Sequence, residues 1–304
     1  MNRFLKSIVL LCGSAWLLLM SSTASAFSHG IYVTQSTAQN KSQLMHLIQQ
    51  SKKYGIDTFI IDVNNTNKRY AENVKTVVQS GIHYVARVVI FPHGGTHAQV
   101  MDKNIWNKRL ALAKYAVSLG ASAIQLDYIR YRAENPPNPQ KAKNILKVVQ
   151  FFKEQLASSH VALQMDVFGI ATLKPAHTIG QDLGLLSQSI DAICPMVYPS
   201  HYEPYKVYSE KPYETIFNAV KALKKQIPAD RKVSIFAYIE SYNYRYPMSH
   251  EKRLRYIASE MKGARDSGAD GWYVWSANNR YQVLFDVLAN RSHAEATETE
   301  KKIG

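Results

Sequence analysis

The sequence predicts a single-domain α/β fold, a closed (β/α)8 barrel of the TIM-like class. Eight β-rich runs begin near Gly30, Thr58, Tyr84, Ala123, Val161, Ala192, Val233 and Gly271. Segments with helical spacing of apolar residues separate these runs, and this alternation favours a parallel sheet with right-handed crossovers. Eight such units fit a closed barrel. A doubly wound open sheet is the second possibility, but no Gly-x-Gly-x-x-Gly motif follows the first run.

The helical segments end in a repeated way. A glycine closes a helical stretch and a β-rich run follows a few residues later, at Gly55, Gly81, Gly120 and Gly268. Glycine past the end of a helix adopts the left-handed backbone at little cost. The runs that follow are dense in valine, isoleucine and aromatic residues, as strands buried on both faces require.

Apolar stripes identify the helices between the runs. In chain order, the stripes are Leu44, Leu47 and Ile48, then Leu110, Ala113 and Val117, then Ile145, Val148, Val149 and Phe152. Spacings of three and four residues place each set on one helical face. We interpret the stripes as packing surfaces against the sheet and not as contacts to a cofactor.

The first 26 residues have the pattern of a secretory signal peptide. Arg3 and Lys6 precede an apolar segment over 7–20, and Ala24 and Ala26 form an A-x-A cleavage signal. The apolar segment is shorter than the roughly 20 residues that span a bilayer, which disfavours a membrane anchor. We expect cleavage after Ala26, export to the periplasm or beyond the cell, and no stable membrane insertion afterwards.

Composition limits the partners of the predicted domain, which covers 27–291 and precedes a disordered tail over 292–304. The formal net charge of +14 indicates attraction to an anionic surface or polymer. For an exported protein we expect an envelope polysaccharide as this polymer and no nucleic acid. Cleavage leaves Cys194 as a lone cysteine, which we predict to be a buried thiol without a disulfide partner.

Acidic residues end several predicted strands, where barrel enzymes carry their active sites. We predict catalytic roles for Asp127, as nucleophile or base, for Asp166, and for Glu240, as a candidate acid. Two carboxyl groups supply the acid and the nucleophile or base of glycoside hydrolysis. Crowded carboxyl groups have pKa values that are pushed apart, so that one group can stay protonated near neutral pH.

Aromatic and polar residues near the same strand ends suit sugar binding. We predict substrate contacts from Asp62, Tyr128, Arg130, Gln181, Met196, Tyr198, His201, Tyr202 and Trp275. We expect no cofactor and no metal: His93 and His97 frame a glycine pair typical of a loop, whereas a helical His pair would suit a metal.

The chain resembles a family of glycosyl hydrolases once classed as a domain of unknown function (DUF4015), distantly akin to α-amylase-like barrels. The matching segments are 30–34, 87–91, 124–131, 166–169, 179–181, 195–202, 212–213 and 271–281. The run Pro-Met-Val-Tyr-Pro-Ser-His-Tyr at 195–202 and the run Asp-Tyr-Ile-Arg at 127–130 are specific. The resemblance implies a TIM-like barrel and a polysaccharide substrate.

The chain departs from this family after the second and seventh strands. Asp62 is followed by Val63-Asn64-Asn65, and Tyr-Ile-Glu-Ser-Tyr at 238–242 replaces the family's Trp-x-Gln-Asp-Phe. From the acids at the strand ends and the resemblance as a whole, we predict hydrolysis of an extracytoplasmic polysaccharide. A barrel that binds envelope carbohydrate without cleaving it is the first alternative, and a structural envelope protein held by charge is the second.

Overall fold

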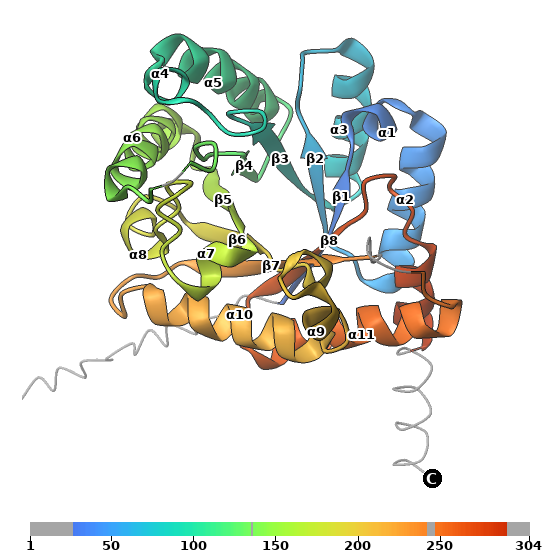
Figure 1. Cartoon of the computed structure of the whole chain (residues 1–304). Helices are drawn as coiled ribbons and strands as arrows, with labels where there is room; N and C mark the ends of the chain where they lie inside the picture. The colour runs from blue at the N-terminus through green and yellow to red at the C-terminus, as the bar shows by residue number, and fades with distance from the viewer. Residues whose placement is uncertain (1–26, 135, 242–246, 291–304) are drawn as a thin grey trace, which may run out of the picture.

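The structure is a closed barrel of eight parallel strands, as predicted (Figure 1). It is a computed structural model that describes residues 27–134, 136–241 and 247–290. The strands are β1 Ser28–Val33, β2 Thr58–Asp62, β3 His83–Val89, β4 Ala123–Asp127, β5 Ala162–Phe168, β6 Ala192–Met196, β7 Ser234–Glu240 and β8 Gly271–Trp275. Each pairs with the next in sequence, and β1 pairs with β8, with Ser28 opposite Gly271, to close the sheet.

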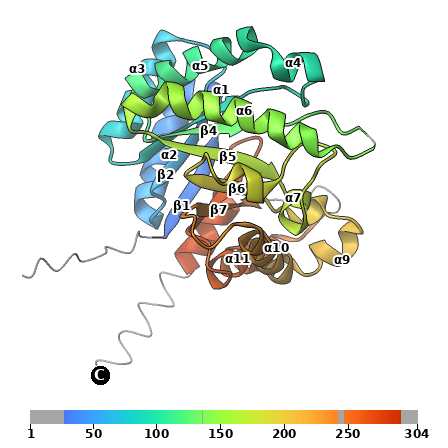
Figure 2. The ribbon, with the colours of Figure 1, turned by 90° about the vertical axis from the view of Figure 1, so that its left-hand side faces the viewer.

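Helices surround the barrel and complete the alternation of strand and helix (Figures 1 and 2). Those with bounds inside the described ranges are α1 Gln35–Gln39, α2 Lys41–Tyr54, α3 Lys68–Gln79, α4 His97–Met101, α5 Lys103–Ser118, α6 Pro139–Leu156, α7 Gly169–Leu173, α8 Leu183–Leu186, α9 Tyr205–Ser209, α10 Pro212–Gln226 and α11 His250–Asp266. Two 3-10 turns are η1 Ala157–Ser159 and η2 Pro199–His201. None of the described helices is long and apolar enough to cross a membrane.

Backbone conformation at the helix ends agrees with the sequence. The four glycines predicted to end helices all have a left-handed backbone, with φ of 71° at Gly55, 83° at Gly81, 94° at Gly120 and 77° at Gly268. A residue with a Cβ atom would be strained in this backbone conformation. The glycines thus let each helix stop and return the chain to the next strand.

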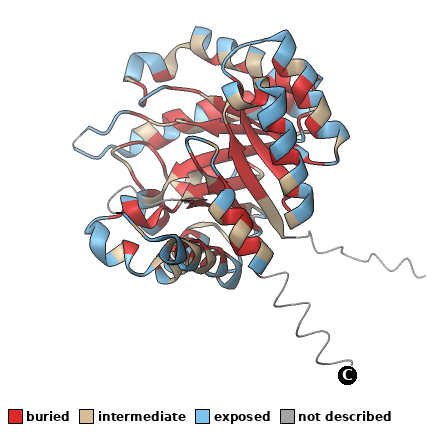
Figure 3. Ribbon diagram, turned by 90° about the vertical axis from the view of Figure 1, so that its right-hand side faces the viewer, coloured by how far each residue is buried: buried red, intermediate tan, exposed pale blue. Residues whose placement is uncertain are grey.

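The core has two parts. A large apolar layer lies between the strands and the helices, and every predicted stripe contributes to it, as Leu44, Leu110 and Phe152 illustrate. A smaller cluster fills the barrel interior, from Tyr32, Ile60 and Val85 to Cys194 and Tyr273. Figure 3 shows the strands buried and the outer faces of the helices exposed. Cys194 is a buried free thiol, as predicted.

A hydrogen-bonded polar layer crosses the interior. The Tyr238 hydroxyl donates to Gln125 Oε1 at 2.9 Å, and Gln125 Nε2 donates to Gln164 Oε1 at 3.2 Å. Gln164 Nε2 in turn donates to the Tyr273 hydroxyl at 3.4 Å. Buried polar groups that satisfy one another in this way hold their side chains in fixed orientations. The layer thereby supports the strand ends that follow it.

Two segments predicted from the sequence lie outside the described residues. These are the signal peptide over 1–26 and the tail over 292–304, so both remain predictions.

Candidate active site

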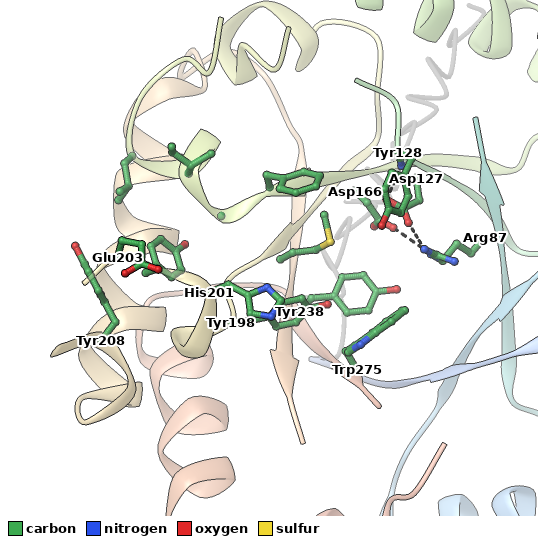
Figure 4. A pocket seen from close by; sticks show the side chains of 16 residues that line it. Arg87, Asp127, Tyr128, Asp166, Tyr198, His201, Glu203, Tyr208, Tyr238 and Trp275 are labelled. Atoms are coloured by element: carbon green, nitrogen blue, oxygen red, sulfur yellow. Dashed lines mark hydrogen bonds and ion pairs between the residues drawn. The ribbon is translucent and has the colours of Figure 1, made fainter. Parts of the chain in front are cut away.

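A cavity of about 570 Å³ opens at the carboxyl ends of the strands. Its walls come from β3 to β8 and from the loops and short helices that follow them. The lining residues are Arg87, Asp127, Tyr128, Asp166, Phe168, Gly169, Ile170, Leu173, Met196, Tyr198, His201, Tyr202, Glu203, Tyr208, Tyr238 and Trp275. Figure 4 shows the acidic residues and Arg87 at one end of the cavity, with Glu203 and Tyr208 at the other.

Arg87 on β3 joins three carboxyl groups at the inner end of the cavity. Its Nη1 pairs with Asp62 Oδ1 and its Nη2 pairs with Asp127 Oδ2 (Figure 4 shows the second contact). Its Nε lies 3.7 Å from Asp166 Oδ2. The charges of Asp127, Asp62 and Asp166 outweigh the effect of burial and raise the pKa of Arg87 well above its usual value. The guanidinium is therefore a fixed positive charge.

Strand register explains why these groups meet. Asp62 lies opposite Arg87 in the β2–β3 pairing, and Val89 lies opposite Asp127 in the β3–β4 pairing. Alternate residues of a strand point to the same side of the sheet. The inward positions of neighbouring strands thus bring one cation among several acids.

Asp166 at the end of β5 differs from its neighbours. It is 2% exposed, and its Oδ1 atom has no hydrogen-bond partner. Burial and the nearby charge of Asp127 raise the pKa of Asp166 well above its usual value, although Arg87 acts in the opposite direction. A protonated carboxyl group at a cavity wall can serve as a general acid.

Asp127 is held from two sides. Its Oδ2 pairs with Arg87, and its Oδ1 accepts a hydrogen bond from the backbone N–H of Tyr128 at 2.5 Å. Tyr128 has a left-handed backbone with φ of 49°, a conformation that non-glycine residues adopt rarely and mostly at functional sites. The turn after β4 therefore fixes the carboxylate and puts the Tyr128 side chain in the cavity wall.

An aromatic surface lies beside the acids. The rings of Tyr32 and Trp275 stack with centroids 4.0 Å apart. The Arg87 guanidinium lies 5.4 Å from the Tyr32 ring and 5.5 Å from the Trp275 ring. The Tyr32 hydroxyl donates to Asp62 Oδ2 at 2.5 Å. Sugar rings stack on faces of this kind, and Trp275 offers one to the cavity.

Eight of the twelve predicted site residues line the cavity: Asp127, Tyr128, Asp166, Met196, Tyr198, His201, Tyr202 and Trp275. The remaining four do not line it: Asp62, Arg130, Gln181 and Glu240. Asp62 contacts Arg87 beneath the wall. Gln181 accepts from the Phe168 backbone N–H at 2.9 Å and so braces the end of β5.

Arg130 does not line the cavity but packs against Phe168, which does. Its guanidinium lies 4.6 Å from the Phe168 ring, and its Nη1 donates to the Tyr131 carbonyl at 2.9 Å. A Cβ atom on Gly94 would come within 2.7 Å of Arg130 Nη1. The side chain is thus packed against the loop after β3, where it supports Phe168.

Glu240 is buried away from the cavity. It is 0% exposed, and both of its carboxylate oxygens accept hydrogen bonds from Ser200 or Tyr256. Burial raises its pKa to about 7, and the hydrogen bonds from Ser200 and Tyr256 oppose this shift. Alternation along β7 predicts an inward position beside Tyr238, but the strand end turns the carboxylate toward η2 and α11.

Sequence reasoning missed several cavity residues, Arg87 foremost. A charged residue inside the apolar run of β3 was the available signal, because a buried strand admits an arginine only where carboxylates pair with it. The apolar residues at the outer end of the cavity were less clearly indicated by the sequence. Ile170 and Leu173 on α7 are 57% and 49% exposed, and both line the cavity.

The described residues contain no group of three or more His, Cys, Asp or Glu side chains placed to bind a metal ion. His97 instead contacts the Tyr131 hydroxyl through Nδ1 at 3.2 Å.

Comparisons with known proteins agree with this architecture. A family model described as "Putative glycosyl hydrolase domain" (DUF4015) matches residues 92–281. No curated protein matches the chain in sequence.

Solved structures share the fold at low sequence identity. The PgaB (BpsB) glycoside hydrolase domain from Bordetella bronchiseptica has a TM-score of 0.61 at 13% identity, over 86% of this chain and 99% of that chain. The endo-β-1,4-mannanase from Thermotoga petrophila has a TM-score of 0.60 at 12% identity, over 83% and 68%. A chitinase from Chromobacterium violaceum has a TM-score of 0.59 at 13% identity, over 86% and 98%.

Proposed function

Because the chain belongs to the glycosyl hydrolase domain family DUF4015, we propose that it hydrolyses glycosidic bonds of a polysaccharide outside the cytoplasm. One observation carries the mechanism. Asp166, whose pKa burial and the charge of Asp127 raise well above its usual value, lines the same cavity as Asp127, whose carboxylate is paired with Arg87. Glycoside hydrolysis needs one carboxyl group that gives up a proton and one carboxylate, and a raised pKa suits Asp166 for the first role.

The proposed reaction uses the two aspartates in different roles. Asp166 donates its proton to the glycosidic oxygen as the bond to the anomeric carbon breaks. Asp127 either takes a proton from the water molecule that attacks the anomeric carbon, or attacks this carbon itself to form a glycosyl ester that water then cleaves, with Asp166 taking the proton from that water. Arg87 orients the Asp127 carboxylate through their ion pair and places a fixed positive charge beside the reacting groups.

The cavity walls support a carbohydrate substrate. Trp275, Tyr198 and Tyr202 present aromatic groups beside the acids. The relatives in the fold comparison include proteins named as a chitinase and an endo-β-1,4-mannanase. The signal peptide predicted from the sequence over 1–26 and the net charge of +14 favour an exported enzyme that acts on an anionic envelope polysaccharide.

The test compares leaving groups. Wild type and Asp166→Asn are assayed on chitin, β-mannan, peptidoglycan and exopolysaccharides, and on 2,4-dinitrophenyl glycosides of the sugar that the wild type releases. We expect Asp166→Asn to lose about 10²–10⁴-fold of activity on the polysaccharide. It should lose far less on the dinitrophenyl glycoside, whose leaving group needs no proton. Equal losses on both substrates would contradict the acid role of Asp166.

A carbohydrate-binding barrel without catalysis is the second candidate. It is favoured by the pairing of both Asp127 oxygens, one with Arg87 and one with the Tyr128 backbone. Glycan binding without product release, unchanged in Asp127→Asn, would select this function over hydrolysis.

A further inference from the structure

Glu240 is a buried acid that the proposed reaction does not use, and its backbone N–H donates to the buried Glu260 Oε1 at 3.2 Å. Its Oε1 accepts hydrogen bonds from the Ser200 backbone N–H at 3.0 Å and from the Tyr256 hydroxyl at 2.7 Å. Its Oε2 accepts from the Ser200 hydroxyl at 2.6 Å. Ser200 and Glu240 are 0% exposed, and Tyr256 is 5% exposed. One side chain of β7 therefore joins the turn η2 to the helix α11.

The bonded turn belongs to the cavity wall. In the sequence, Ser200 follows Tyr198 by two residues and directly precedes His201 and Tyr202, and these three residues line the cavity. A hydrogen bond to the Ser200 backbone fixes the main chain from which these three side chains project. At the start of the same segment, the Val197 backbone N–H donates to the Tyr238 carbonyl at 3.1 Å. The end of β7 thus holds this segment through its backbone and through Glu240.

The wall has little room to move. A Cβ atom on Gly169 would lie 2.5 Å from the Tyr202 hydroxyl and 2.8 Å from the Met196 carbonyl. The segment is therefore packed against the end of β5, which carries Asp166. A shift of the turn would move the aromatic wall relative to the acid, and we expect this to weaken substrate binding more than the chemical step.

We propose that Glu240 is a positioning residue, which holds the segment 198–202 against the cavity through Ser200 and is itself held by Tyr256. The inference rests on the proposed function for its kinetic readouts. Glu240 does not donate a proton to substrate, because its oxygens face Ser200 and Tyr256 and do not line the cavity.

The experiment uses two variants that weaken the chain of hydrogen bonds from Ser200 through Glu240 to Tyr256 at different points. Glu240→Gln keeps the size of the side chain but replaces one acceptor oxygen with a donor. Tyr256→Phe removes a single hydroxyl on α11, outside the barrel. Matched controls are Glu251→Gln on the exposed face of α11 and Tyr213→Phe, whose hydroxyl pairs with Asp266 on the surface.

The first readout is hydrogen exchange of the free protein and needs no substrate. We expect amide exchange in 198–202 to rise on the order of tenfold in Glu240→Gln and Tyr256→Phe, and to stay at the wild-type rate in both controls. Wild-type exchange in both test variants would overturn the proposal. If the proposed hydrolysis fails, this readout still decides the positioning role.

The second readout separates positioning from acid catalysis. On the polysaccharide that the wild type cleaves, both variants should raise KM by about tenfold while kcat changes by less than about threefold. The loss should be the same on a dinitrophenyl glycoside. A loss confined to kcat in Glu240→Gln, rescued by the dinitrophenyl leaving group and absent in Tyr256→Phe, would instead make Glu240 an acid.

Discussion

At the scale of single residues, the candidate site depends on one buried cation. Arg87 contacts Asp62, Asp127 and Asp166, and among the described residues that line the cavity it is the only arginine or lysine. Three acidic side chains on β2, β4 and β5 could not stay buried together without it, because an unpaired buried charge is costly. Within this group, burial and the charge of Asp127 raise the pKa of Asp166 well above its usual value, and Arg87 only partly opposes this shift.

Replacement of Arg87 by methionine should destabilise the protein strongly. Arg87→Met keeps much of the side-chain volume but leaves Asp62 and Asp127 buried without their partner. We expect a loss of about 3–5 kcal/mol in the free energy of unfolding at pH 7, measured with urea. Lys153→Met is the control, since its pair with Asp191 is nearly half exposed and should contribute at most about 1 kcal/mol. Equal small losses in both variants would contradict the role given to Arg87.

At the scale of elements, short segments after the strands shape the site. The helix α7 follows β5 without a loop, and its first residue is Gly169. The close approach of Met196 and Tyr202 to this glycine sets the spacing between the ends of β5 and β6. The helix also presents Ile170 and Leu173 to the cavity.

A methyl group at Gly169 tests this packing. Gly169→Ala should cost about 1–3 kcal/mol in the free energy of unfolding, because its Cβ would overlap the Tyr202 hydroxyl and a backbone carbonyl. Tyr202→Phe in the same chain removes one of these atoms and should restore part of the loss. A melting temperature of Gly169→Ala equal to that of wild type would show that the two strand ends are loosely packed.

The elements also show how far the sequence alone could lead. The strands were predictable because β-rich runs alternate with helical segments, four of which end in a glycine, and the observed starts agree within two residues at Gly30, Tyr84 and Val161. Asp127 and Asp166 were predictable because strand ends face one mouth. The partners of Glu240 were not: Ser200 and Tyr256 lie 40 and 16 residues away, and only the folded barrel brings them together.

At the scale of the whole molecule, three buried acids link folding to pH. Burial raises the pKa of Glu240 from 4.5 to about 7, and it raises the pKa of Asp166 and Glu260 well above their usual values. Folding therefore favours the protonated form of each group. For Glu240, the stability that results is fully present below the unfolded pKa near 4.5 and is lost as pH rises through about 7.

The free energy of unfolding should accordingly fall between pH 5 and pH 8. Urea denaturation at fixed ionic strength measures this dependence. Glu240→Gln and Glu260→Gln should each show a shallower fall than wild type, because each removes one group whose pKa differs between the folded and unfolded states. Slopes identical to that of wild type in both variants would mean that neither acid binds a proton on folding.

The central claim, hydrolysis by the carboxyl pair at the barrel mouth, is tested most directly by one comparison. Release of reducing ends from envelope polysaccharides and exopolysaccharides is measured for wild type, Asp127→Asn and the control Asp102→Asn, which keeps a favourable N-cap for α5. The account predicts cleavage by wild type and by the control, and loss of cleavage in Asp127→Asn. Undiminished cleavage by Asp127→Asn would contradict it.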